Sequence, residues 1–142
     1  MDAPINIAVE LVLPRGPKQP GRLVVAVTGP RKFNQSELLY NALDGVEYFA
    51  SKHGLILTLV EGGQLGTDSI AREWAKAQDI DVITEIAFWS FDGKTAGEKR
   101  NQRMIDNHQP DLCIAMSGGR GDMVQRCKAA GIPVFALNQG AE

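Results

Sequence analysis

The stretch 55–77, LILTLVEGGQLGTDSIAREWAKA, constrains the fold most, because it joins an apolar run, a glycine-rich turn and a helical pattern. Residues 55–60 carry no charge, which predicts a strand buried on both faces of a parallel sheet. The glycines of 61–66 let the backbone turn tightly and let a ligand approach it closely. We expect Thr67 or Asp68 to cap the helix that follows. The stretch therefore predicts a strand–turn–helix unit of an α/β fold.

The rest of the chain repeats this alternation. Apolar runs predict further strands over 23–28, 81–88, 111–116 and 133–137. Helical spacing predicts helices over 37–52 with Ser36 as its cap, over 98–107, and over 123–130 with Asp122 as its cap. The segment 89–97 is predicted to be a loop. Strands separated by helices give a single Rossmann-like, doubly wound, mostly parallel sheet, for which we expect the strand order 3-2-1-4-5.

The first twenty-two residues form a separate part of the chain. Apolar residues alternate over 5–13, INIAVELVL, which predicts an extra amino-terminal strand with one covered face. The segment 14–21, PRGPKQPG, has the composition of a linker. We therefore divide the chain into 1–22 and a ligand-binding domain over 23–142. Contact of the extra strand with a second subunit would make the protein a homo-oligomer, a dimer or a tetramer.

Three glycine-rich turns follow predicted strands: TGPR at 28–31, EGGQLGTD at 61–68 and SGGRGD at 117–122. In a doubly wound sheet, ligands bind outside the carboxyl ends of the strands, where the strand order reverses. The three turns are expected to border one crevice at that point. Unpaired N–H groups at a helix start attract anions, so the crevice suits a phosphate. The alternative is that these glycines serve only the packing of strands against helices.

The distribution of charge favours a small anionic ligand. The formal net charge of −2 argues against the broad basic surface that nucleic acids require. Positive residues nonetheless gather in or beside the turns: Arg31, Lys32, Lys99, Arg100, Arg103, Arg120 and Arg126. A positive pocket on an acidic protein suits a small anion better than a polymer.

Several other classes of protein are not indicated. The 2 cysteines lie in patterned segments and are expected to be buried, and the 2 histidines are isolated from them. We therefore expect no metal and no cofactor. No apolar run approaches the roughly 20 residues that span a bilayer, and the start of the chain lacks the pattern of a signal peptide. These features predict a cytoplasmic protein without a membrane partner.

The order of the motifs resembles a known family. Gly29-Pro30-Arg31, EGGQLGTDSIAREWA, AGEKRNQRM, SGGRGDM and AGIPV occur in that order between residues 23 and 137. This arrangement is similar to the YspA-related branch of the SLOG superfamily. Relatives include the lonely-guy phosphoribohydrolases, the lysine-decarboxylase-like proteins, DNA-processing protein A and sensor domains of antiphage systems.

The resemblance implies a crevice for a nucleotide ligand, with phosphates on backbone N–H groups. The glycines and the arginine that it places there are Gly29, Arg31, Gly62, Gly63, Gly66, Gly118, Gly119 and Gly121. Side chains in the same motifs complete the expected ligand-binding set: Thr67, Asp68, Arg100, Asn101 and Ser117.

The side chains of the AGEKRN motif have alternative roles. Arg100 matches the arginine that touches the phosphoribosyl group in the hydrolase relatives, and a guanidinium suits phosphate. A surface arginine paired with Glu98 or Asp106 is the alternative. Asn101 either contacts ribose or holds the loop.

Other residues near the turns also have two possible roles. Asp68 either caps its helix or accepts a hydrogen bond from a ribose hydroxyl. Trp89 and Phe91 either stack on a base or cover the core.

The chain departs from the hydrolase relatives at the last turn. Those relatives have Gly-Thr and then a glutamate on the following helix, whose carboxylate acts at the N-glycosidic bond. Here Gly121 is followed by Asp122-Met123-Val124-Gln125. The candidate catalytic residues are Asp122, as the carboxylate, and Arg100. We therefore expect a sensor or sequestering protein for an ADP-ribose derivative or a cyclic nucleotide. The alternatives are a nucleoside monophosphate N-glycosidase and, less favoured, a single-strand DNA binder.

Overall fold

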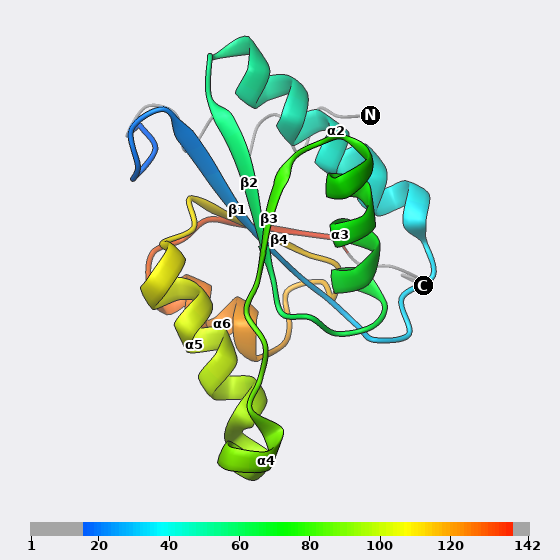
Figure 1. Ribbon diagram of the computed structural model, residues 1–142, viewed down its shortest axis with the longest axis vertical. Helices are drawn as coiled ribbons and strands as arrows, with labels where there is room; N and C mark the ends of the chain where they lie inside the picture. The colour runs from blue at the N-terminus through cyan, green and yellow to red at the C-terminus, as the bar shows by residue number, and fades with distance from the viewer. Residues whose placement is uncertain (1–15, 138–142) are drawn as a thin grey trace.

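The computed structural model describes residues 16–137 of the chain. The predicted strand over 5–13 lies outside the described residues. Within them, the chain forms a five-stranded sheet of order β3-β2-β1-β4-β5, and every pair of neighbouring strands is parallel. The predicted Rossmann-like α/β fold and its strand order are therefore confirmed (Figure 1).

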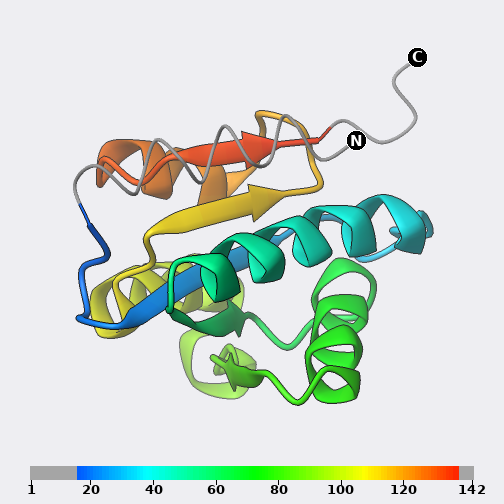
Figure 2. The same cartoon turned by 90° about the horizontal axis from the view of Figure 1, so that it is seen from above.

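The elements follow each other in the predicted alternation. The strands are β1 (Arg22–Thr28), β2 (Ile56–Glu61), β3 (Asp81–Thr84), β4 (Leu112–Ala115) and β5 (Val134–Ala136). The helical segments are α2 (Ser36–Lys52), α3 (Thr67–Ala77), α4 (Trp89–Asp92), η2 (Gly93–Thr95), α5 (Ala96–His108) and α6 (Asp122–Ala129). Helices α2 and α3 lie on one face of the sheet, and α5 and α6 lie on the other (Figures 1 and 2).

Strand β1 shows how the sequence places the core. Its side chains alternate between the two faces of the sheet, as strand geometry requires. Leu23, Val25 and Val27 belong to the apolar cluster under α2 and α3. Val24 and Ala26 belong to the cluster under α5 and α6. Both faces of β1 are therefore buried, which explains its uninterrupted apolar run.

Two predictions between β2 and α5 were wrong. The third strand ends at Thr84 instead of residue 88, and the expected loop over 89–97 contains α4 and η2. Apolar content alone extended the predicted strand, but Ile86 and Phe88 lie outside the sheet and are exposed.

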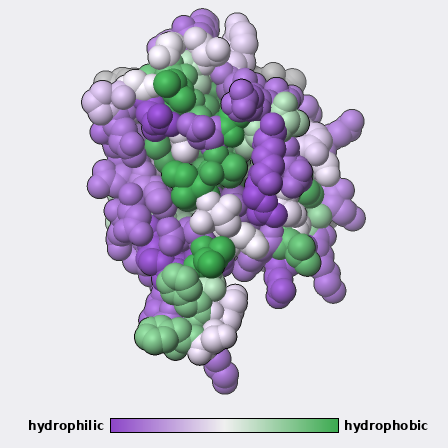
Figure 3. Space-filling view, in the orientation of Figure 1, coloured by the Kyte–Doolittle hydropathy of each residue, from purple (hydrophilic) through white to green (hydrophobic). Residues whose placement is uncertain are grey.

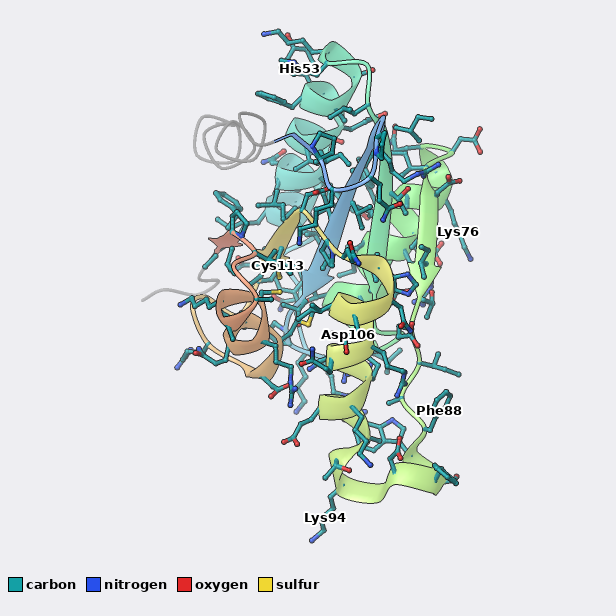
Figure 4. The ribbon with its side chains drawn as sticks, turned by 90° about the vertical axis from the view of Figure 1, so that its left-hand side faces the viewer. His53, Lys76, Phe88, Lys94, Asp106 and Cys113 are labelled. Atoms are coloured by element: carbon teal, nitrogen blue, oxygen red, sulfur yellow. The ribbon has the colours of Figure 1, made fainter. Side chains whose placement is uncertain are left out.

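Helix α4 forms a lobe that projects from the domain and carries apolar side chains (Figure 3). Phe88 and Lys94 lie on this lobe, at the opposite end of the molecule from His53 (Figure 4).

The two cysteines are confirmed as buried, unpaired thiols. Cys113 of β4 and Cys127 of α6 belong to the apolar cluster between the sheet and helices α5 and α6. Among the residues described, no helix is both long and apolar enough to cross a membrane.

Strand β2 offers a test of the core. Leu59 is 0% exposed in β2, and Leu65, in the turn that follows, is 71% exposed. Leu59→Ala should lower the free energy of unfolding by about 2–5 kcal/mol, because it leaves a cavity. Leu65→Ala is the matched control, and it should change the free energy of unfolding by less than about 0.5 kcal/mol. Urea denaturation measures both. Equal effects of the two substitutions would contradict this arrangement.

Candidate functional site

The turns after β1, β2 and β4 border one cavity. Strands β1 and β4 are neighbours in the middle of the sheet although α2, α3 and α5 separate them in the chain, so the strand order reverses between them. A cavity of about 260 Å³ lies at this point. The predicted residues that line it are Gly29, Gly62, Asp68, Arg100, Asn101, Ser117, Gly121 and Asp122.

Other predicted residues do not line the cavity. They are Arg31, Gly63, Gly66, Thr67, Gly118 and Gly119. Thr67 Oγ1 donates to the carbonyl oxygen of Pro30 at 3.1 Å, and this bond ties the first turn to the second. A Cβ on Gly66 would overlap the backbone of Arg31 and lie 2.5 Å from Pro30 O. Thr67 and Gly66 therefore hold the first and second turns close together.

Part of the lining was missed by sequence reasoning. The additional residues are Val27, Thr28, Pro30, Gln64, Met104, Arg120, Met123 and Val124. Arg120 and Gln64 lie in recognised turns and could have been included on position alone. Met104 and Met123 belong to the apolar cluster under α5 and α6, and helical periodicity does not distinguish a cavity floor from the core.

Asp68 holds the second turn instead of capping its helix. Its Oδ2 accepts hydrogen bonds from Gly62 N at 3.1 Å and Gln64 N at 3.3 Å. The N-cap position of α3 is Gly66, with no side-chain cap, so the predicted capping by Thr67 or Asp68 was wrong. Both side chains have partners in the turns rather than at the helix end.

A second buried carboxylate completes the turn. Glu61, at the end of β2, is 0% exposed. Its Oε1 accepts from Gly63 N at 2.7 Å and pairs with Arg72 Nη1 at 3.1 Å, while Oε2 accepts from the Thr84 hydroxyl. The N–H groups of Gly62, Gly63 and Gln64 therefore all donate to carboxylates of the protein itself.

Arg100 closes the turn from α5. It is 5% exposed, its Nη1 donates to Gly62 O at 2.5 Å, and its Nε donates to Asn101 Oδ1 at 2.8 Å. A Cβ on Gly62 would lie only 2.6 Å from Nη1, so glycine is needed there for the approach of the guanidinium. The alternative pairing with Glu98 or Asp106 is not found. Arg100 is a buried cation of the cavity wall.

Burial sets the protonation of these groups. Burial raises the pKa of Asp68 to about 6, and the charge of Glu61 adds to this, whereas the N–H of Gln64 and the charge of Arg100 oppose it. Burial likewise lowers the pKa of Arg100, and the charges of Asp68 and Glu61 oppose that shift. At neutral pH the wall therefore presents an ionised Asp68 beside a charged arginine.

Asp122 is available at the cavity because it does not cap α6. The N-cap position is Gly121, with φ of 105°, and no side chain caps the helix, so the predicted capping was wrong. The Asp122 carboxylate accepts from Asn101 Nδ2 at 3.1 Å and pairs with Arg126 Nε at 2.6 Å. Asn101 therefore links Arg100 to Asp122 across the cavity.

The third turn has a different hydrogen-bond pattern from the second. Gly118 N donates to Leu137 O at 2.8 Å, and Ser117 Oγ donates to Arg120 O at 2.8 Å. Among residues 16–137, the N–H groups of Gly119, Arg120 and Gly121 have no acceptor. The first N–H groups of α6 also lack intrahelical acceptors, as at any helix start. This side of the cavity offers free donors.

Fewer basic residues line the cavity than the sequence predicted. Of the seven basic residues expected near the turns, Arg100 and Arg120 line the cavity. Arg103 pairs with Glu85 at 3.0 Å and Lys99 with Asp92 at 3.4 Å. Trp89 and Phe91 do not line the cavity either, and they are 57% and 88% exposed, so neither covers the core.

A larger cavity of about 430 Å³ is lined by residues at the starts of β1 and β3. Arg22, Asp81 and His108 border it, and none of the predicted site residues does. Its place at the amino ends of the strands is not where doubly wound sheets bind ligands. The cavity at the carboxyl ends is the candidate site.

Amide hydrogen exchange tests the contrast between the two turns. In the free protein, the amides of Gly62, Gly63 and Gln64 should exchange slowly, because they donate to buried carboxylates. The amides of Gly119 and Arg120 should exchange rapidly, since they have no acceptor in the described residues. NMR resolves both sets in one sample. Equal exchange in both turns would contradict the hydrogen bonds described here.

Comparison with known proteins identifies the family of this chain. The model of the YspA, cpYpsA-related SLOG family matches residues 23–90, from β1 into α4. The chain is also 34% identical to the Gene 61 protein of Mycobacterium phage D29 over 120 residues, which cover 78% of this chain and 93% of that protein. No solved structure matches the chain. The SLOG assignment expected from the motifs is confirmed: the chain belongs to the YspA, cpYpsA-related SLOG family.

Proposed function

We propose that this protein binds a nucleotide-derived small molecule, such as an ADP-ribose derivative or a cyclic nucleotide, and acts as its sensor or sequesters it. One observation supports this most. The cavity has free N–H donors on the side of α6 and a buried carboxylate and arginine on the side of β2. A nucleotide offers the complementary pair, an anionic phosphate and a sugar with hydroxyl donors.

The phosphate is assigned to the third turn. The N–H groups of Arg120 and Gly121 line the cavity and have no acceptor among residues 16–137, so together with the positive end of the α6 dipole they attract an anion. Arg120 adds a positive side chain at the same wall, and Arg126 offsets the charge of Asp122. The second turn is a poorer phosphate site, since its N–H groups already donate to Asp68 and Glu61.

The size of the cavity fits part of a nucleotide. Its 260 Å³ is slightly below the range of about 300–1,000 Å³ that is typical of sites for drug-sized ligands. Such a volume suits a ribose phosphate rather than a whole nucleotide. A single-strand DNA binder would need a continuous basic track with stacking platforms, and several of the basic residues considered are instead paired with carboxylates.

An N-glycosidase is the second candidate, because Asp122 lines the cavity and is not a helix cap. Two features oppose it. The glutamate of the hydrolase relatives has no counterpart after Gly121. Asp122 itself is already hydrogen-bonded to Asn101 and ion-paired with Arg126, which limits its use as a base.

Calorimetry with a panel of nucleotides, together with mass spectrometry of small molecules that copurify with the protein, tests the proposal. At least one nucleotide should bind and should slow the exchange of the Gly119 and Arg120 amides. Absence of binding across linear and cyclic nucleotides, with no copurifying ligand, would refute it.

Substitutions in the turn before α6 and in the last turn of α6 test the phosphate position. Arg120→Ala should weaken nucleotide binding by about three- to tenfold, and the effect should shrink at high salt, because an exposed charge is screened. Lys128→Ala makes the same change of charge in the last turn of α6. It is the matched control and should leave the affinity unchanged. Similar losses from both substitutions would indicate a general charge effect instead of a phosphate contact.

Turnover distinguishes the two candidate functions. We expect slow or no release of base from nucleoside monophosphates, far below the enzyme median of roughly 10 s⁻¹. Chromatography of the free base measures it. Turnover near that median, lost in Asp122→Asn, would establish the N-glycosidase and make Asp122 its catalytic carboxylate. Arg103→Ala, a change on α5 outside the cavity lining, serves as the control for nonspecific loss of activity.

A further inference from the structure

We propose that Asp68 is the specificity-determining residue of this site: its carboxylate accepts a hydrogen bond from a ribose hydroxyl, so that the protein selects ribonucleotides over deoxyribonucleotides. This inference rests on the proposed function and assigns the sugar end of its ligand.

The hydrogen bonds of Asp68 leave one oxygen without a partner. Oδ2 accepts from Gly62 N and Gln64 N, whereas Oδ1 accepts no hydrogen bond from any described residue. Asp68 is nevertheless only 5% exposed, and it lines the cavity. A buried carboxylate oxygen without a donor is unfavourable, so a donor supplied by the ligand stabilises it.

The surroundings of Asp68 select a neutral donor. The charge of Glu61 acts on the Asp68 carboxylate, so a phosphate beside Asp68 would be repelled by two carboxylates. A metal ion is disfavoured because the positive charge of Arg100 already acts on the Asp68 carboxylate and would repel a second cation. Glu61 is also fully engaged by Gly63, Arg72 and Thr84. A hydroxyl donates a hydrogen bond without adding charge of either sign.

The position of Asp68 in the cavity identifies which hydroxyl it meets. Arg120 and Gly121 of the third turn, whose N–H groups have no acceptor among residues 16–137, line the same cavity of about 260 Å³ as Asp68. In a nucleotide, the ribose is the group bonded directly to the phosphate. A phosphate at the third turn therefore brings a ribose hydroxyl, and not the base, within reach of Asp68.

The variant Asp68→Asn changes the acceptor while keeping the turn. The amide oxygen can accept from Gly62 N and Gln64 N as Oδ2 does, and the amide nitrogen then replaces the free oxygen. An acceptor facing the ligand becomes a donor. Asp106→Asn makes the same change on the exposed face of α5 and is the matched control. Thermal unfolding verifies that each variant is folded.

The test compares adenosine 5′-monophosphate with its 2′-deoxy and 3′-deoxy analogues by calorimetry. The wild-type protein and the control should bind the ribonucleotide about ten- to a hundredfold more tightly than at least one deoxy analogue. Asp68→Asn should lose this preference. Equal binding of all three ligands to the wild type, or an unchanged preference in Asp68→Asn, overturns the inference. Failure of the wild type to bind any nucleotide instead overturns the proposed function.

The pH dependence of the wild type is a second readout that needs no variant. ADP-ribose is the probe, since its pyrophosphate stays ionised across the range. A hydroxyl donor favours the ionised carboxylate, so affinity should rise as the pH increases through about 6, the pKa of Asp68 in the free protein. The groups that face Asp68 are Glu61 of β2, Arg100 of α5 and the N–H groups of Gly62 and Gln64. Affinity that falls over this interval would place an anion beside Asp68, and affinity that is flat would mean that the ligand does not contact its carboxylate. Either result overturns the inference.

Discussion

The buried carboxylates Glu61 and Asp68 hold the turn between β2 and α3, and the site depends on that arrangement. Between them they accept the N–H groups of Gly62, Gly63 and Gln64. Burying two like charges is unfavourable unless they are paired and hydrogen-bonded. Arg72 on α3 pairs with Glu61, and Arg100 on α5 reaches the same turn through Gly62 O. Helices from both faces of the sheet therefore meet at one glycine-rich turn.

This arrangement makes the glycine-rich turns after β2 and β4 chemically different although they look alike in sequence. The turn after β2 has its donors occupied and presents a carboxylate. The turn after β4 has N–H groups beside the start of α6 that find no acceptor in the part of the chain that the structure describes. The cavity between them therefore has hydrogen-bond donors on one side and a carboxylate acceptor on the other. A ligand with an anion at one end and hydroxyl donors next to it matches that direction, which is the physical basis for proposing a nucleotide.

Apolar periodicity predicted the regular elements of this chain better than its loops and helix ends. Strands and helices followed from apolar periodicity because both faces of the central strands are buried, as in β1. The prediction was wrong where apolar residues are exposed, as at Ile86 and Phe88, since composition does not report whether a partner strand is present. The predicted caps Asp68 and Asp122 failed for a related reason: a short polar side chain at a helix start bonds whichever donor the fold brings nearest. The predicted cap Ser36 was also wrong, because Ser36 is the first residue of α2 and the N-cap position is Gln35.

The sequence by itself determined the order of the elements and brought the three glycine-rich turns to one edge of the sheet, because parallel strands with right-handed crossovers leave few alternatives. Which N–H groups in those turns stay free was decided by the tertiary structure. Arg100 binds a carbonyl 38 residues away, and Asn101 reaches a carboxylate 21 residues away. Such pairings depend on how closely α5, α6 and the sheet pack, and distances of this kind are not encoded in the spacing of residues along the chain.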